Sequence, residues 1–203
     1  MVFHSLRSKK LIDLIKNGAI GVVPTDTIYG ISASALNKEA VERMTVIRRR
    51  DESKPFIILI GDFADLLRVG IVVTEPILER LRSLWPAPVS IILPCPDKKI
   101  HYLHRGLTSL AIRMPDDSAL LAFLKKTGPL VSTSVNRPEG SSPATTVEEV
   151  RQYFGDDLDF MVDAGKRAGS PSTILRLDGD HMIVVRQGEY IPPQETQTKE
   201  SHT

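Results

Sequence analysis

The chain has 203 residues, of which 41% are apolar and 25% charged, and its formal net charge is +1. This length suits one sizeable domain with a full core, and the near-neutral charge excludes a strongly basic, general nucleic-acid binder. A local basic patch stays open, because 26 Lys and Arg residues are present. No apolar run approaches the roughly 20 residues that cross a bilayer, and the N-terminus lacks a signal peptide's apolar core. We therefore expect a cytoplasmic protein.

The first half of the chain alternates between helix and strand signals. Apolar spacing predicts a helix over residues 8–17, closed by Asn17-Gly18, and a buried strand over residues 19–23. A helix capped by Asn37 runs to Arg48, and an apolar strand spans residues 56–60. Helices over 62–69 and 74–84 follow, and then a strand over 89–93.

The second half continues with a strand over 110–113, a helix over 116–126 and a strand over 130–134. Thr146-Val147-Glu148-Glu149 has the capping-box pattern and starts a helix that runs to about residue 154. Strands over 160–163, 173–177 and 182–186 finish the pattern, and the short gaps between them favour antiparallel pairing. We expect one α/β domain over residues 1–190, with a mixed, twisted sheet and helices packed against it, and a flexible polar tail over 191–203.

Polar chemistry gathers directly after the first predicted strand, in Pro24-Thr25-Asp26-Thr27-Ile28-Tyr29-Gly30. Proline removes a backbone donor and ends a strand ladder. The hydroxyls, carboxylate and phenol beyond it then leave the sheet end, where open α/β sheets hold ligands. Alone, the segment is equally consistent with a Thr-rich turn.

Cations gather between a helix end and a buried strand, at Arg48-Arg49-Arg50 and Lys54. They fit a polyanion clamp, since guanidinium groups bind phosphate oxygens bidentately. The alternative is a solvated basic cap that offsets the helix dipole. Arg113 ends an apolar strand and needs an anionic partner, which is either an internal acid such as Asp26 or a ligand.

Small polar residues end the strand over 130–134. Alternation places Ser132, Ser134 and Asn136 on one face, where they suit phosphate or carboxylate oxygens or simply form a hydrogen-bonded turn. Two further polar segments border the late strands, Ser170-Pro171-Ser172 and Arg186-Gln187-Gly188. They are consistent with ligand contacts and equally with ordinary turns at strand ends. The sequence holds no glycine-rich nucleotide loop and no metal-ligand spacing, so phosphates would be held by cations and short polar loops.

Together and in this order, these segments resemble the YrdC-like family, whose members include threonylcarbamoyl-AMP synthases, in its short single-domain form. The matching segments are 24–30, the basic segment through Lys54-Pro55-Phe56, 110–115, 132–136, 171–174 and 186–188. The resemblance implies a concave basic cavity in the sheet. It also implies that L-threonine, bicarbonate and ATP, with Mg²⁺, yield threonylcarbamoyl-AMP and pyrophosphate. A downstream transferase then moves the threonylcarbamoyl group to tRNA, which the protein itself could contact.

The resemblance also implies residue roles. It assigns L-threonine binding to Thr27, Arg113, Ser132 and Ser172. It assigns ATP binding to Arg50, Lys54, Ser109, Ser134, Ser142 and Arg186, and catalysis to Arg48, Arg50, Lys54 and Asn136.

Two residues depart from the family pattern. Arg48 stands where Lys is usual, and Leu59 stands where some relatives place a His near the threonine pocket. Because Arg and Lys are not equivalent at a tight site, one alternative is a paralogue that binds RNA or nucleotide without synthase activity. Another is a relative that transfers carbamoyl groups to a different acceptor.

Overall fold

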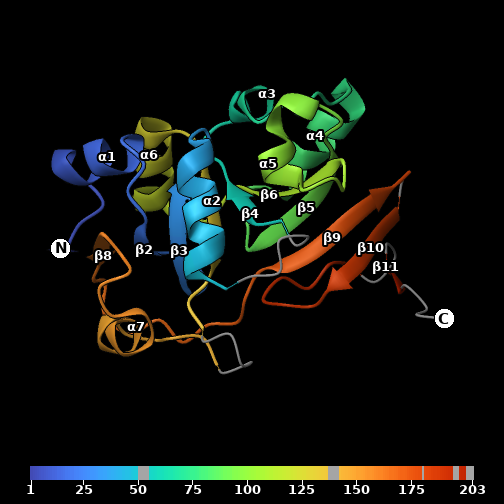
Figure 1. The fold of residues 1–203 in the computed structure, drawn as a ribbon. Coiled ribbons are helices and arrows are strands. Elements are labelled where there is room, and N and C mark those ends of the chain that lie inside the picture. Colours follow the sequence, from blue (N-terminus) through green and yellow to red (C-terminus); the bar gives the residue numbers. More distant parts are fainter. Residues whose placement is uncertain (50–54, 137–141, 180, 194–196, 200–203) are drawn as a thin grey trace.

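The computed structural model describes residues 1–49, 55–136, 142–179, 181–193 and 197–199 (Figure 1). The strands are β1 (Val2–Phe3), β2 (Gly21–Pro24), β3 (Tyr29–Ser34), β4 (Ile57–Leu59), β5 (Val89–Pro94), β6 (Ser109–Arg113), β7 (Leu130–Ser134), β8 (Phe160–Val162), β9 (Thr173–Asp178), β10 (His181–Arg186) and β11 (Gln197–Lys199). The helices are α1 (Lys9–Lys16), α2 (Lys38–Ile47), α3 (Asp65–Arg68), α4 (Glu75–Leu84), the 3₁₀ turn η1 (Lys98–Ile100), α5 (His101–His104), α6 (Ser118–Thr127) and α7 (Val147–Phe154).

The strands form one mixed sheet in the order β1-β8-β2-β3-β7-β4-β6-β5-β9-β10-β11. Antiparallel pairs join β2 to β3, β3 to β7, β7 to β4, β6 to β5 and β9 to β10, and the other pairs are parallel. The expected α/β domain with a mixed sheet is confirmed. Antiparallel pairing of the late strands holds for β9 and β10, whereas β8 lies near the other end of the sheet, beside β2.

Helices cover both faces of the sheet, and strand alternation divides the apolar side chains between two cores. Val22 belongs to the core that α2 covers, together with Met44, whereas the adjacent Val23 belongs to the core that α1 and α6 cover. Leu11 of α1 and Phe123 of α6 are fully or almost fully buried in this second core. In Figure 1 the helices α1 and α6 lie side by side, and they are in contact.

Side-chain caps start α1, α2 and α6, and one of them, Asn37 at α2, is a cap that the sequence predicts. The side chains of Ser8, Asn37 and Asp117 accept hydrogen bonds from backbone N–H groups three residues later, at 3.4, 3.0 and 2.9 Å. These bonds satisfy donors that a helix leaves unpaired in its first turn. At α7 the Glu149 carboxylate accepts from the backbone of Thr145 at 2.6 Å, one residue before the cap that a capping box would use.

Several elements were not foreseen. The sequence predicts no strand at β3, because its residues are rich in Gly, Ala and Ser and include few β-branched side chains. Neither η1 nor α5 was predicted, since each is only one turn long. The strand β11 lies inside the polar segment 191–203, where no apolar alternation marks a strand. The division into a 1–190 domain and a flexible tail stays a prediction.

In the part of the chain that the structure describes, no helix has both the length and the apolar character needed to cross a membrane.

Candidate active site

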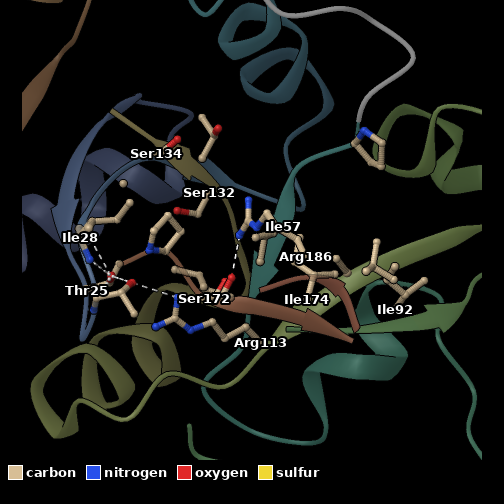
Figure 2. A pocket seen from close by; sticks show the side chains of 18 of the residues that line it. Thr25, Ile28, Ile57, Ile92, Arg113, Ser132, Ser134, Ser172, Ile174 and Arg186 are labelled. Atoms are coloured by element: carbon tan, nitrogen blue, oxygen red, sulfur yellow. Dashed lines mark hydrogen bonds between the residues drawn. The ribbon is translucent and has the colours of Figure 1, made fainter. Parts of the chain in front are cut away.

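A cavity of about 300 Å³ opens in the middle of the sheet (Figure 2). Its walls come from β3, β4, β6 and β7, from Thr25, Thr27 and Ile28, from Ile92 of β5, and from the ends of β9 and β10. The predicted site residues that line it are Thr27, Ser109, Arg113, Ser132, Ser134, Ser172 and Arg186. Residues up to 159 positions apart in the sequence therefore meet in one space, because the strands that carry them are neighbours in the sheet.

Other predicted residues lie elsewhere. Arg48 and Asn136 stand behind the cavity wall rather than in it, and Ser142 is exposed and does not line the cavity. Arg50 and Lys54 lie outside the described residues, so their assignment to ATP stays a prediction. Leu59, one of the two departures from the family pattern, does line the cavity.

Arg113 lines the cavity and pairs with Asp26, the internal acid that was one of its two expected partners. Its side chain is 5% exposed and donates from Nη2 to Asp26 Oδ1, while Nη1 donates to Thr27 Oγ1 at 3.2 Å. The second carboxylate oxygen of Asp26 accepts from the backbone N–H of Asp116 at 2.9 Å, which fixes the acid. Within the described residues Arg113 Nε is buried without a hydrogen-bond partner, so one donor of the guanidinium is not used by the protein.

The Thr-rich segment is both a turn and a cavity wall. Thr25 Oγ1 donates to the carbonyl of Ile28 at 2.7 Å and accepts from the N–H groups of Thr27 and Ile28 at 3.2 Å. These bonds close a tight turn that holds the Thr27 hydroxyl 2.9 Å from Thr25 Oγ1 and within reach of Arg113. The two sequence interpretations of this segment are therefore compatible.

Each cavity serine near Arg113 has a second serine behind it. Ser132 Oγ accepts from Ser32 Oγ at 3.3 Å, and Ser172 Oγ lies 3.0 Å from Ser90 Oγ. Sequence reasoning missed Ser32 and Ser90. Ser32 lies on the unforeseen strand β3, and Ser90 is a lone serine in an apolar run, so neither carried a signal of its own.

Arg48 holds the loop that follows β7. It is 7% exposed, and its guanidinium donates to the Asn136 carbonyl and, at 3.1 Å, to Asn136 Oδ1. It also lies 5.5 Å from the centre of the Phe154 ring, a cation–π contact. Asn136 Oδ1 accepts in turn from the cavity residue Ser134 at 2.8 Å. The interpretation of Arg48 as a solvated cap is wrong, because the side chain is buried between α2, α7 and this loop.

The expected shared face of Ser132, Ser134 and Asn136 holds only for the two serines. The strand β7 ends at Ser134, so strand alternation no longer directs Asn136, and its side chain turns to Arg48. Asn136 therefore does not line the cavity itself but holds the hydroxyl of the cavity residue Ser134.

The far end of the cavity is mostly apolar. Ile57, Ile92 and Ile174 border it, with Arg186 beside them (Figure 2). Arg186 Nη2 donates to the Ser172 carbonyl at 2.8 Å, which ties the end of β10 to the segment that carries the cavity serine.

Tyr29 lies at the cavity but is an anchor rather than an acid or base. Its hydroxyl donates to the Gly165 carbonyl at 2.7 Å and accepts from the N–H of Ala164 at 2.9 Å. Burial raises the pKa of the Tyr29 phenol above its ordinary value, so the group stays neutral and holds the segment after β8.

The basic character expected of the cavity stays a prediction. Among the described lining residues there are two arginines and no Asp or Glu. Nor do the described residues hold any group of three His, Cys, Asp or Glu side chains that could bind a metal. The nearby carboxylate of Asp26 is already engaged by Arg113 and Asp116. These residues therefore do not fit a Mg²⁺ ion held by protein ligands.

The chain is similar in sequence to several known proteins. The family model for Sua5, YciO and YrdC proteins, described as "Telomere recombination", matches residues 13–188. The putative threonylcarbamoyl-AMP synthase of Methanocaldococcus jannaschii is 32% identical over 187 residues, which cover 89% of this chain and 86% of that protein. The threonylcarbamoyl-AMP synthase of Bacillus subtilis is 31% identical over 86% of this chain, but this chain spans only 51% of that longer protein.

Solved structures show the same fold. The P. abyssi Sua5 structure complexed with L-threonine has a TM-score of 0.80 and 26% identity, and the match covers 93% of this chain and 57% of that one. E. coli YciO has a TM-score of 0.78 and 22% identity, with 93% of this chain and 94% of that chain covered.

Proposed function

The chain belongs to the Sua5/YciO/YrdC family, and from that premise we propose that it is a threonylcarbamoyl-AMP synthase. It would join L-threonine, bicarbonate and ATP into threonylcarbamoyl-AMP and release pyrophosphate. The observation that carries the proposal is the convergence of Thr27, Arg113, Ser132 and Ser172 on one cavity. A relative with the same fold, P. abyssi Sua5, has been solved with L-threonine.

We assign the Arg113 end of the cavity to L-threonine. A carboxylate there would meet a buried guanidinium that Asp26 and Thr27 hold in one orientation. Charge-assisted hydrogen bonds of this kind are about twice as strong as neutral ones. The hydroxyls of Ser132 and Ser172 supply further polar contacts, so the small cavity suits a compact amino acid.

We assign the opposite end to ATP. Ser109, Ser134 and Arg186 line it, and the apolar wall that includes Ile92 and Ile174 suits the flat base of a nucleotide. Arg50, Lys54 and Ser142 complete this assignment as proposals. Because no acidic side chain among the described residues lines the cavity, Mg²⁺ would arrive with ATP and be held by phosphate oxygens and water.

The reaction needs positioning more than covalent help. The neutral amine of threonine attacks the carbon of bicarbonate, water leaves, and a carbamate forms. A carbamate oxygen then attacks the α-phosphorus, and pyrophosphate leaves. Holding two reactants in line supplies about 7–11 kcal/mol of a barrier, and fixed cations stabilise the charge that develops on phosphate oxygens. Arg48 contributes indirectly, since it fixes Asn136 and through it Ser134.

The product would serve tRNA modification. Threonylcarbamoyl-AMP is an activated mixed anhydride, so a downstream transferase would pass its threonylcarbamoyl group to adenosine in tRNA, with the synthase in the cytoplasm. A paralogue that only binds nucleotide or RNA remains the alternative outcome of the test. The similarity to proteins named as synthases favours the synthase.

The test is pyrophosphate release from ATP, Mg²⁺, L-threonine and bicarbonate. We expect release that requires both threonine and bicarbonate. Ser172→Ala should raise the KM for L-threonine more than the KM for ATP, whereas Ser83→Ala, on the exposed face of α4, should change neither. Nucleotide binding without threonine-dependent release would overturn the synthase and favour the binding paralogue.

A further inference from the structure

Two fully buried serines stand behind the two cavity serines, and nothing in the proposed reaction explains them. Ser32 on β3 and Ser90 on β5 are each 0% exposed. Neither lines the cavity, yet each has its hydroxyl against a serine that does. We propose that Ser32 and Ser90, the backing serines, are positioning residues that aim the hydroxyl protons of Ser132 and Ser172 at an anionic group of the bound amino acid. This inference rests on the proposed function.

The direction of the bond between Ser90 and Ser172 follows from burial. Ser90 is wholly enclosed, and within the described residues its hydroxyl has one hydrogen-bond partner, Ser172 Oγ at 3.0 Å. A buried hydroxyl donor rarely goes unpaired, because an unsatisfied donor costs about 1–3 kcal/mol. Ser90 therefore donates and Ser172 accepts. The proton of Ser172 is left for the cavity.

The same direction holds for the other pair. Ser32 and Ser132 are directly opposite each other in the β3–β7 register, and the geometry makes Ser32 Oγ the donor to Ser132 Oγ at 3.3 Å. The space for this arrangement comes from Gly30, where a Cβ atom would lie 2.5 Å from Ser132 Oγ. Ser132 therefore also accepts from behind and presents its proton to the cavity.

The Thr27 hydroxyl presents an acceptor to the cavity, whereas the hydroxyls of Ser132 and Ser172 present donors. Thr25 already donates its hydroxyl proton to the Ile28 carbonyl, so in the 2.9 Å contact between the two threonines Thr27 is the donor. The Thr27 oxygen then presents lone pairs, one of which accepts from Arg113. The cavity offers proton donors at Ser132, Ser172 and Arg113, and an acceptor at Thr27.

This pattern matches an α-amino acid or its N-carbamate. The carboxylate and the carbamate are pure acceptors and need donors, whereas an amine or a hydroxyl can donate to Thr27. Without a backing serine, the cavity hydroxyl keeps its proton but rotates freely between staggered positions. This rotational freedom weakens, on average, the hydrogen bond from that hydroxyl to the substrate.

The test uses Ser32→Ala and Ser90→Ala, with Ser34→Ala as the matched control. Ser34 is a buried serine on the same face of β3 as Ser32, and it lies outside the cavity wall. Calorimetric titration with L-threonine and steady-state assays would give its Kd and the KM for both substrates. We expect each backing-serine variant to raise the Kd and KM for L-threonine about threefold to tenfold, as for the loss of about one hydrogen bond. The KM for ATP and the behaviour of Ser34→Ala should stay unchanged.

A second pair of variants separates positioning from a merely structural role. In a Ser172→Ala background, Ser90→Ala should have no further effect on L-threonine binding, since no proton remains to aim. A loss that persists at full size in that background, or wild-type binding by both backing-serine variants, would overturn the inference. Should Ser90→Ala not fold, the corresponding pair at Ser32 and Ser132 decides.

The two proposals fail in different ways. Wild-type protein that neither binds nor turns over L-threonine would overturn both the proposed function and this inference. Wild-type protein that turns over L-threonine, with equally active backing-serine variants, would overturn the inference alone.

Discussion

The substitution Gly30→Ala tests whether the strand backbone leaves the Ser132 side chain room to move. The residue is buried in β3, and an added Cβ would lie 2.5 Å from Ser132 Oγ, against 3.4–4 Å for ordinary van der Waals contact. The strand backbone cannot yield easily, because β3 is paired on both sides, with β2 and β7. The serine must therefore rotate away, and its hydroxyl leaves both Ser32 and the cavity.

Two opposing effects set the size of the change. Replacing Gly by Ala in a strand removes backbone freedom from the unfolded chain, which is worth about 0.5–1 kcal/mol in favour of folding. Overpacking costs about 1–3 kcal/mol, and the broken Ser32–Ser132 bond costs about 1 kcal/mol more. The steric effect wins, so we expect unfolding free energy to fall by about 1–3 kcal/mol. The KM for L-threonine should rise about fivefold, as for one lost hydrogen bond.

Urea denaturation in two backgrounds tests the reasoning. When Ser132 is already Ala, the Oγ that Gly30→Ala would strike is absent. The substitution should then be neutral or stabilise by about 0.5–1 kcal/mol. Equal destabilisation with and without the Ser132 hydroxyl would refute the proposed clash, since the cost would come from elsewhere in β3.

Three further predictions concern charged side chains outside the serine pairs. Arg48→Lys should lose at least one of the two hydrogen bonds to Asn136 and so lower the unfolding free energy by about 1 kcal/mol. It should lower kcat more than it changes the KM for L-threonine. An unchanged kcat would show that the site does not need a guanidinium at this position. Asp26→Asn should cost about 3–5 kcal/mol in urea denaturation, because Arg113 stays buried without its counter-charge; a loss below about 1 kcal/mol would show that the pair tolerates neutralisation. Hydrogen bonding from a backbone N–H just before α7 lowers the pKa of Glu149, so its contribution to stability is present above the ordinary carboxyl pKa and is lost as the pH falls through the lowered value. The Tm of Glu149→Gln should therefore fall less on acidification than that of the wild type, and identical pH profiles would contradict this.

The sequence predicted those features that depend on neighbours along the chain. The cap at Asn37 was predicted because a cap needs only the next three residues. The pairing of Arg113 with Asp26 was one of two stated alternatives, since a charge at the end of an apolar strand requires a partner.

Features that depend on strand register were not predictable. Ser32 and Ser132 are 100 residues apart, and Ser90 and Ser172 are 82 apart, so their contacts exist only once the strand order is known. The burial of Arg48 likewise depends on the loop after β7 and on Phe154 of α7, neither of which is near it in sequence. Residue type alone left a phosphate clamp and a solvated cap as alternatives there, and the bonds to Asn136 were not foreseen.

The most direct test of the proposed function is mass spectrometry of the nucleotide product formed from ¹³C-bicarbonate, L-threonine, ATP and Mg²⁺. The synthase reaction predicts an AMP adduct that contains threonine and one ¹³C atom, formed in step with pyrophosphate. ATP hydrolysis to ADP or AMP without a labelled threonine adduct, or no turnover by protein that still binds nucleotide, would contradict it.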